Sequence, residues 1–347
     1  MQRHMISPLI IAAALCHPAT ALAHSGGEAR ETVEAVCSAC HSIRTVESTS
    51  GYSRDDWQSL TATMIDLSGA PEMQAEILDY LAEHYPPNDN RAATPVDGPL
   101  IISFEEWQVP TLGQRSRDPV EAGDGSIWWV GQWLDILGRL DPETGAMEEF
   151  DLPAGAGPHS VTIGPDGDAW YTGNRNATIG RFNPASGEIT EYPMPDEAAR
   201  DPHTAEFDAN GIMWFSLQGS NMIGRLDPQS GEVRLVDSPR ANSRPYGVKI
   251  AEDGIVWVAC NGANCLLRVD PETMDVEEIT LPDAGTTVRR LDIDADGMIW
   301  WVNSRLGRLG RYDPQSGEIR EWDSPSGSSS HPYAIAVFDG AIWYNES

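Results

Sequence analysis

A tryptophan that recurs about every 43 residues is the feature of this sequence that most restricts its fold. The recurring residues are 42, 44, 43, 43 and 43 positions apart: Trp128, Trp170, Trp214, Trp257, Trp300 and Trp343. A Gly-Arg or Leu-Arg pair and then an Asp-Pro or Asn-Pro turn follow each of the first five. Repeats of this length with four short strands each are typical of β-propellers. We therefore expect an all-β propeller over residues 101–347.

The second full repeat shows how each blade is expected to be built. Its four expected strands are Ser160 to Gly164, Ala169 to Thr172, Ile179 to Asn183 and Glu188 to Tyr192. A Pro-Asp-Gly turn joins the first two strands, because glycine supplies the positive φ that a tight hairpin requires. We interpret Phe104 to Pro110 as an outermost strand that comes first and closes the ring against the last blade. On this count about five and a half blades are present.

The N-terminal segment has the pattern of a secretory signal peptide. Arg3 and His4 precede an apolar run from Met5 to Cys16, and small residues at Ala21 to Ala23 supply a cleavage site. The apolar run is too short to remain as a membrane anchor. We expect residues 1–23 to be removed and the mature protein to be exported, which in a bacterium means the periplasm.

The segment from Cys37 to His41 reads C-S-A-C-H, the pattern of a covalent c-type haem site. The thiols of Cys37 and Cys40 would attach to the haem, and His41 would be the proximal ligand of the iron. Zinc sites use a similar cysteine pair, but the next cysteines, Cys260 and Cys265, are far away in the sequence. A thioredoxin-like dithiol would need a βαβ context, which the sequence lacks. Haem c is therefore the expected cofactor.

Residues 24–87 are expected to form a small all-α domain around that haem. Apolar residues recur at helical spacing in two stretches, 55–67 and 71–84. Residues 88–100 then change to a composition rich in Asn, Asp, Ala, Pro and Gly, which is typical of a linker. The propeller at 101–347 follows that linker.

The distal ligand of the haem iron is predicted by resemblance. Three motifs resemble a short monohaem cytochrome c domain: C-x-x-C-H-S from Cys37, W-x(6)-M from Trp57 and G-A-P from Gly69. The resemblance implies Met64 as the distal ligand, with Met73 and His84 as the other candidates. Methionine ligation would make the site an electron carrier. We therefore expect electron transfer with a periplasmic redox partner.

Two further features agree with an exported, soluble protein. Cys260 and Cys265 flank four residues at the tip of an expected hairpin, and an oxidising compartment favours a disulfide between them over two free thiols. The formal net charge of -30 makes nucleic acids and anionic membranes unfavourable partners. Basic redox partners or cationic ligands would be attracted instead.

The repeats resemble those of the virginiamycin B lyase, or streptogramin lyase, family. In the second repeat the motifs are Gly157-Pro158-His159, Gly164-Pro165-Asp166-Gly167, Trp170-Tyr171-Thr172, Ile179-Gly180-Arg181 and Glu191-Tyr192-Pro193. The resemblance implies a seven-bladed propeller and a magnesium-assisted elimination that opens the ester of a cyclic depsipeptide. Because the repeats stop at Ser347, just after the Trp343 strand, we interpret the chain as a C-terminally incomplete form of such a propeller.

The resemblance also indicates catalytic candidates. The family site combines a Glu-Pro-His, a second histidine and a glutamate just beyond an aromatic strand. Asp201 and His203 match the first element, with aspartate in place of glutamate, and His159 matches the second. Gln218 occupies the glutamate position and can be neither a metal-binding carboxylate nor a base, while Glu346 resembles that glutamate. The candidates are therefore Asp201, His159 and His203, with Mg²⁺ as an implied cofactor.

The central channel is the expected place for a small-molecule ligand. In a propeller, the residues that open the inner strands and those that end the tryptophan strands surround this channel. These residues are Arg117, His159, His203, Tyr246, Arg289 and Tyr333, with Gln132, Asn174, Gln218, Asn261 and Asn303. Histidine can accept a proton near neutral pH, and arginine can hold a carboxylate or enolate oxygen. The alternative is that each side chain only forms hydrogen bonds at a strand end.

Three functions agree with these features. The favoured one is an exported electron-transfer haem protein whose propeller binds or transforms a small molecule. The alternatives are a magnesium-dependent carbon–oxygen lyase that opens a depsipeptide lactone, and a propeller that serves only as a binding platform. If the protein is an enzyme, a lyase of this type or a haem-linked oxidoreductase is expected.

Overall fold

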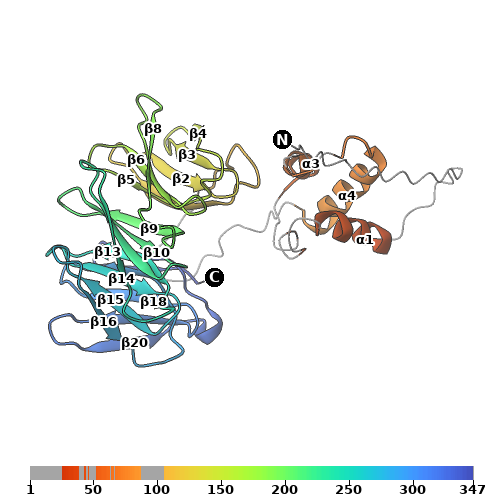
Figure 1. Cartoon of the computed structure of the whole chain (residues 1–347). Helices are drawn as coiled ribbons and strands as arrows, with labels where there is room; N and C mark the ends of the chain where they lie inside the picture. The colour runs from red at the N-terminus through yellow and green to blue at the C-terminus, as the bar shows by residue number, and fades with distance from the viewer. Residues whose placement is uncertain are drawn as a thin grey trace, which may run out of the picture. The chain divides into compact units, whose positions relative to one another are not determined.

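The computed structural model describes residues 26–38, 43, 46, 52–62, 64–65, 67–86 and 105–346. The chain divides into two compact units, Met1–Glu105 and Glu106–Ser347 (Figure 1). The expected signal peptide, the linker at 88–100, and the residues Cys40 and His41 lie outside the described residues. No helix in the described part of the chain is long and apolar enough to cross a membrane.

The first unit is helical. Its described helices are α1 (Gly26–Cys37), α3 (Arg54–Ala62) and α4 (Pro71–His84), and α4 contacts both of the others. Their buried apolar side chains are Val33 of α1, Trp57 and Leu60 of α3, and Ile77, Leu78 and Leu81 of α4. Proline can open α4 because the first turn of a helix leaves its backbone N–H groups unpaired.

Helix α3 is shorter than the sequence pattern predicts. A capping box starts it, since Ser53 and Asp56 each accept a hydrogen bond from the other's backbone N–H. The helix ends at Ala62, and Met64 follows in a turn where its N–H donates to the carbonyl of Thr61, at 3.0 Å. The expected helical stretch 55–67 is therefore wrong beyond residue 62, because the chain must reverse before α4 begins.

The second unit is a series of antiparallel sheets, as the tryptophan repeat predicts. The first sheet contains β1 (Ser116–Glu121), β2 (Ile127–Gly131), β3 (Ile136–Leu140) and β4 (Met147–Asp151). The second contains β5 (Pro158–Ile163), β6 (Ala169–Gly173), β7 (Thr178–Phe182) and β8 (Ile189–Pro193). The third contains β9 (Pro202–Phe207), β10 (Met213–Leu217), β11 (Met222–Leu226) and β12 (Val233–Asp237). The repeat thus forms one four-stranded meander per unit.

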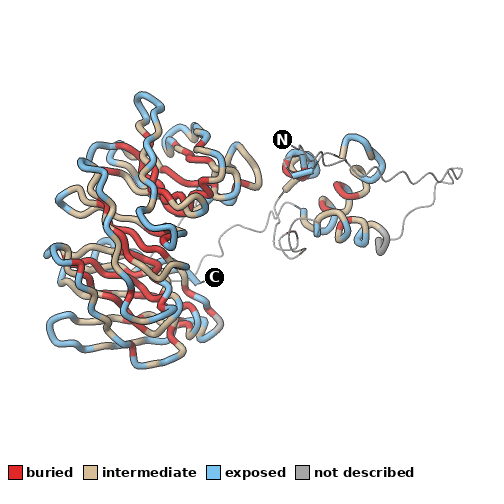
Figure 2. The backbone as a smooth tube through the Cα atoms, in the orientation of Figure 1, coloured by how far each residue is buried: buried red, intermediate tan, exposed pale blue. Residues whose placement is uncertain are grey.

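The remaining sheets continue this order around the unit (Figure 1). The fourth contains β13 (Pro245–Ile250), β14 (Val256–Cys260), β15 (Cys265–Val269) and β16 (Val276–Thr280). The fifth contains β17 (Val288–Ile293), β18 (Ile299–Asn303), β19 (Arg308–Tyr312) and β20 (Ile319–Asp323). The last contains β21 (Ile335–Phe338) and β22 (Ala341–Tyr344), after a 3₁₀ turn at Gly327–Ser329. The cores lie between consecutive sheets, where the second and third strands are mostly buried (Figure 2).

The expected closing strand at Phe104 to Pro110 is not a strand in its described part, residues 105–110. Trp107 instead lies against Gly145 in the turn after β3, with its indole nitrogen 3.1 Å from the place of a Cβ on that glycine. A closing strand would need a third strand in the last sheet to pair with. The described part of that sheet contains two strands, β21 and β22.

The glycine of each Gly-Arg pair is required by the aromatic residue opposite it. Tyr171 of β6 is paired with Gly180 of β7, and a Cβ at Gly180 would lie 2.0 Å from the tyrosine ring. The same pairing joins Trp129 to Gly138, Phe215 to Gly224 and Trp301 to Gly310. In the fourth sheet Val258 replaces the aromatic residue and Leu267 replaces the glycine. The side chains at the two paired positions therefore fill one volume together: an aromatic ring faces a glycine, or a valine faces a leucine.

Candidate functional site

The innermost strand of each four-stranded sheet carries a bulge in its first half. In β9, His203 and Thr204 stand opposite a single residue, Ser216 of β10, and the other four sheets show the same shift of register. A bulge turns two consecutive side chains toward the same side of a strand. The innermost strands also contact one another in sequence, so the bulges meet around the central axis.

Hydroxyl groups hold these bulges in place between neighbouring sheets. Ser216 accepts the N–H of Thr204 at 3.3 Å and donates to the carbonyl of Tyr246 in the next inner strand, at 2.5 Å. Thr172 does the same one sheet earlier, accepting the N–H of Ser160 and donating to the carbonyl of His203, both at 3.0 Å. The positions of both histidine-bearing bulges are thus fixed by buried hydrogen bonds.

Five side chains, from the inner strands of the first four sheets and from the segment before β21, form a layer across one end of the channel. This layer is here called the channel ring: Arg117, His159, His203, Tyr246 and Tyr333. The rings of His159 and His203 lie 3.4 Å apart between centroids, and His203 and Tyr246 lie 4.0 Å apart. The hydroxyls of Tyr246 and Tyr333 are hydrogen-bonded at 2.6 Å, and Arg117 donates to Tyr333 at 3.5 Å. The expected gathering of these residues is therefore confirmed.

The second expected set of channel residues is only partly in place. Gln132 accepts a hydrogen bond from Arg117 at 2.9 Å and so supports the channel ring. Asn174 donates to the carbonyl of Pro202, and Asn303 is fully buried in hydrogen bonds with Thr286 and Thr287, just before β17. Asn303 therefore caps a turn rather than lining the channel.

An ion pair lies directly below the channel ring. Arg290 of β17 donates to Asp118 of β1 at 2.7 Å and to the hydroxyl of Thr204 at 3.3 Å. Asp118 also lies 3.9 Å from the guanidinium of Arg117 and 3.7 Å from Nδ1 of His159. Neither Asp118 nor Arg290 is among the site residues expected from the sequence. The sequence signal that could have identified Arg290 is its position next to Arg289, because a bulge can direct two consecutive side chains inward.

The inner strands enclose a channel of about 930 Å³. Its walls include Arg115, Asp118, Thr204, Arg290 and Tyr333, and it continues to Glu206 and Lys249 at the other ends of the strands. There Lys249 lies 3.2 Å from Glu206 and 3.8 Å from Asp292. Burial lowers the pKa of Lys249, but these two carboxylates outweigh the burial and raise it, so the lysine is charged. This volume is typical of a small-molecule site.

Both histidines of the channel ring are neutral. Burial lowers the pKa of His159 to about 3, with Asp118 opposing the shift and Arg117 and Arg290 adding to it. Burial lowers the pKa of His203 well below 6.5, and the neighbouring His159 adds to that shift. They are 5% and 3% exposed, so the histidines pack beside the channel rather than forming its wall. Burial also raises the pKa of Tyr246, to about 12.

Asp201 is not directed at the histidines. Its carboxylate accepts the backbone N–H of Gly219 at 2.5 Å and that of Ser220 at 3.3 Å, so it fixes the loop after β10. Burial raises the pKa of Asp201, and those hydrogen bonds oppose the rise. Glu346 accepts hydrogen bonds from Ser326. These two carboxylates therefore have structural partners outside the channel ring.

The candidates do not fit a magnesium site. In the described part of the chain, no group of three or more His, Cys, Asp or Glu residues is placed to hold a metal ion. The rings of His159 and His203 pack against each other with their planes tilted by 37°, and Gln218 stands where the resemblance implies a glutamate. No step through a magnesium ion is therefore derived for this chain.

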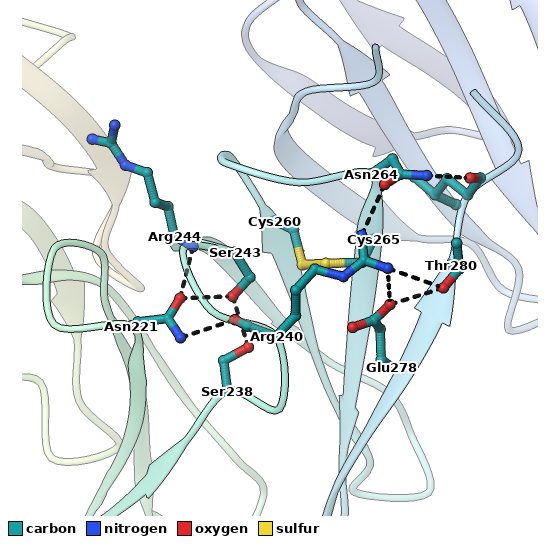
Figure 3. The surroundings of a disulfide bond; sticks show 11 residues. Asn221, Ser238, Arg240, Ser243, Arg244, Cys260, Asn264, Cys265, Glu278 and Thr280 are labelled. Carbon is teal, nitrogen blue, oxygen red and sulfur yellow. Dashed lines mark hydrogen bonds and ion pairs between the residues drawn. A yellow bond between two sulfur atoms is a disulfide. The ribbon is translucent and has the colours of Figure 1, made fainter. Parts of the chain in front are cut away.

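Cys260 and Cys265 form the expected disulfide, with their Cα atoms 5.3 Å apart. Both are fully buried at the β14–β15 hairpin, and Cys260 is paired with Pro245, the residue before Tyr246 (Figure 3). Arg240 extends past the hairpin to Asn264, at 2.8 Å, and to Glu278 and Thr280. The disulfide therefore anchors the strand end that carries one member of the channel ring.

The described haem candidates lie at the edge of the helical unit. Cys37 is half-buried at the end of α1 and has a free thiol, and burial raises the pKa of that thiol. Met64 is 53% exposed and Met73 is 40% exposed. His84 stacks on Tyr80, and its Nδ1 lies 3.0 Å from the carbonyl of Tyr80. None of these side chains belongs to the buried core of the unit.

Comparison with known proteins identifies the family of the second unit. The virginiamycin B lyase family model matches residues 101–347. A virginiamycin B lyase from Staphylococcus aureus is 27% identical, with a TM-score of 0.62 over 67% of this chain and 77% of that one. A catalytically inactive histidine-to-alanine variant of the Staphylococcus aureus lyase with quinupristin is 25% identical, with a TM-score of 0.65 over 70% of this chain and 80% of that one.

A streptogramin B lyase structure is 24% identical, with a TM-score of 0.65 over 70% of this chain and 80% of that one. No curated protein sequence matches the chain. The family model covers most of the sequence, and the repeated sheets agree with it. The chain belongs to the virginiamycin B lyase family.

Proposed function

We propose that the propeller binds a small organic molecule at the channel ring and transforms it by proton transfer. The observation that carries this proposal is the contact between two neutral histidines, His159 and His203, within a layer to which four sheets and the segment before β21 contribute. A neutral imidazole has one nitrogen that accepts a proton and one that donates. Two such rings side by side supply both functions without a change of charge in the resting site.

The partners of the two rings favour opposite roles. Nδ1 of His159 lies 3.1 Å from the carbonyl oxygen of His203, which can only accept, so Nδ1 carries the hydrogen and Nε2 is free to accept a proton. Nδ1 of His203 lies 3.1 Å from the hydroxyl of Thr204, which receives a hydrogen bond from Arg290. That hydroxyl is then oriented to donate to Nδ1 and leaves the proton of His203 on Nε2.

An elimination needs this combination. A base removes a proton beside the ester, and an acid returns a proton to the departing oxygen. His159 is the proposed base, since Asp118 at 3.7 Å would stabilise its protonated form, and His203 is the proposed acid. Both are buried, so the proposal requires ligand binding to open the channel ring and expose the two Nε2 atoms.

The test uses the full-length protein with a cyclic depsipeptide lactone and magnesium, and follows the mass of the product. A ring-opened product of unchanged mass is expected, and it should be lost in His159→Gln and His203→Gln. Gln218→Glu is a matched variant that supplies the carboxylate of the family and should raise the rate. A gain of one water would show hydrolysis and contradict elimination. No opening in a run where a known lyase works would refute the proposed chemistry.

We propose that the helical unit is an exported, periplasmic c-type haem domain that transfers electrons. The specific support is the C-S-A-C-H sequence at the end of α1 together with three apolar side chains that the helices leave exposed: Met64, Ile65 and Met73. Thiols, an imidazole and a thioether fit a haem by their chemistry. When bound, the haem would supply one-electron transfer. Cys37 and Cys40 would hold it, and His41 and Met64 would be ligands of its iron.

The axial ligand can be tested separately from the propeller. In protein matured in a periplasm, Met64→Ala should abolish the absorption band of methionine-ligated haem iron, whereas Met73→Ala should keep it. If Met73→Ala abolishes the band and Met64→Ala does not, the distal ligand is Met73 and the assignment from motif resemblance is wrong. His84→Ala is the control for the third candidate.

A further inference from the structure

We infer that the ligand of the channel ring is an organic anion, a small carboxylate held by Arg115, Arg117 and Arg289. This inference rests on the proposed function, because it specifies the chemical class of the molecule that the propeller binds. It differs from what the overall charge of the chain suggests, since a protein with a formal net charge of -30 attracts cations in general.

Charge at the channel ring is the reverse of the charge of the chain. Four guanidinium groups lie at this end of the channel: Arg115, Arg117, Arg289 and Arg290. One carboxylate, Asp118, is paired with them, and its shortest contact is the 2.7 Å bond to Arg290. Arg117 shares this carboxylate at 3.9 Å, so four positive charges face one negative charge, and Arg115 and Arg289 have no carboxylate partner in the described part of the propeller. Like charges held together in a partly buried site favour an added anion.

The hydrogen-bonding capacity of these arginines is also incompletely used. Nε of Arg117 is buried without a hydrogen-bond partner, although this residue donates through its other nitrogens to Gln132 and Tyr333. The guanidinium of Arg289 lies 5.2 Å from the ring centre of Tyr333 and 5.9 Å from that of Tyr246. In residues 105–346 no ion pair joins Arg289 to a carboxylate. Its planar donors are therefore available to a ligand.

Arg115 brings a further charge to the edge of the same site. Its guanidinium stacks at 5.3 Å on Trp133, which is 47% exposed. Burial, followed by the repulsion of Arg117, lowers the pKa of Arg115, so the two charges act on each other. Arg115 itself has no ion pair to a carboxylate in the described part of the propeller, and Arg117 shares Asp118 with Arg290. A bound carboxylate would relieve that repulsion.

The arginines elsewhere in the propeller show that this pattern is local. Four of the five arginines at the Gly-Arg and Leu-Arg positions on the third strands form ion pairs with carboxylates: Arg139 with Asp124, Arg181 with Asp166 and Asp168, Arg268 with Glu277, and Arg311 with Glu318. Where an arginine has only a structural role in this chain, it commonly has an acidic neighbour. Of the four arginines at the channel ring end, Arg115 and Arg289 have no ion pair to a carboxylate in the described part of the propeller, and Arg117 and Arg290 share Asp118.

The surrounding groups fit a carboxylate attached to a planar or apolar body. The phenols of Tyr246 and Tyr333 can donate to an oxygen, and burial keeps Tyr246 protonated at neutral pH. Their rings, with Trp133, offer apolar faces. An arginine that binds a carboxylate through two parallel N–H groups also fixes its orientation, which a phenol alone cannot do.

Carboxylic acids and their uncharged amides of the same shape provide the test. Calorimetric titrations of the full-length protein would use benzoate and benzamide, phenylacetate and phenylacetamide, and glutarate and glutaramide. At least one acid should bind with a 1:1 stoichiometry, and its amide should bind at least about ten-fold more weakly. Arg289→Gln should lower the affinity for that acid by about ten-fold and leave the amide unchanged. Arg268→Gln, which removes a charge from a paired arginine of β15, is the matched control and should change neither.

Three results would overturn the inference: no measurable binding of any acid in the panel, equal affinity for acid and amide, or an acid affinity that Arg289→Gln does not change. The outcome is separable from that of the lactone assay. Lactone opening without a preference for acids would support the proposed function and remove the anion assignment. A preference for acids without lactone opening would keep the anion site and remove the elimination.

Discussion

The ion pair below the channel ring gives a quantitative prediction. Asp118→Asn removes one negative charge and keeps the shape of the side chain. Asp118 has a φ of 45°, a left-handed conformation that asparagine adopts as readily as aspartate, so the substitution adds no backbone strain. Its effect therefore reports the charge interaction with Arg290, Arg117 and His159.

The expected loss follows from the burial of both partners. The side chains of Asp118 and Arg290 are 14% and 20% exposed, and removing one partner of such a buried pair costs about 3 to 5 kcal/mol. Arg290 retains its hydrogen bond to Thr204, which places the estimate at the lower end, about 3 kcal/mol. For a unit of this size that corresponds to a fall in Tm of roughly 6 to 12 °C.

Thermal unfolding followed by tryptophan fluorescence is the assay. Of the 12 tryptophans only Trp57 lies in the helical unit, so the signal reports the propeller. Asp323→Asn is the control, because its carboxylate pairs with Arg308 at 81% exposure and should contribute at most about 1 kcal/mol. Adding Arg290→Met to Asp118→Asn should recover part of the loss. If the fall in Tm for Asp118→Asn is no larger than the fall for Asp323→Asn, the buried ion pair does not stabilise the propeller as proposed.

Three further predictions concern the same unit. Replacing Cys260 and Cys265 by alanine should lower the free energy of unfolding by about 2 kcal/mol, and a reductant should then have no further effect on Tm. Burial lowers the pKa of His159 to about 3, so between pH 6.5 and 3 the unfolded chain binds a proton that the native chain does not. The free energy of unfolding therefore decreases as the pH is lowered from 6.5 to 3. His159→Gln should flatten that slope by up to about 1.4 kcal/mol per pH unit in denaturant titrations. Gly180→Ala should cost about 1 to 3 kcal/mol by the same titrations, since its Cβ would meet the ring of Tyr171, and a neutral substitution would contradict the proposed packing.

The sequence predicts the repeated architecture well because its signals are local. Each recurring tryptophan sits on the second strand of a sheet, and Asp-Gly pairs and proline turns bound the strands. In the second sheet, all eight predicted strand ends lie within two residues of those observed. The family resemblance rests on the same local motifs, and the family model confirms it.

The sequence predicts the site less completely because the site depends on distant pairing. Asp118 and Arg290 are 172 positions apart, and nothing in either segment shows that they meet. Asp201 occupies the position of a family catalytic residue, yet two backbone N–H groups determine where its carboxylate points. Asn303 was placed in the channel from its position in the repeat, but local hydrogen bonds bury it. Periodicity identifies equivalent positions, whereas side-chain direction depends on the individual partners.

We propose that one exported chain combines a haem-bearing helical unit with a propeller of the virginiamycin B lyase family, and the mass of one peptide tests the haem. The full-length protein would be matured in a periplasm, denatured and digested, and the peptide that contains Cys37 and Cys40 would be weighed. We expect this peptide to carry one covalent haem, and the N-terminal peptide to lack residues 1–23. A peptide with two free thiols, or with a disulfide between Cys37 and Cys40, would contradict this proposal.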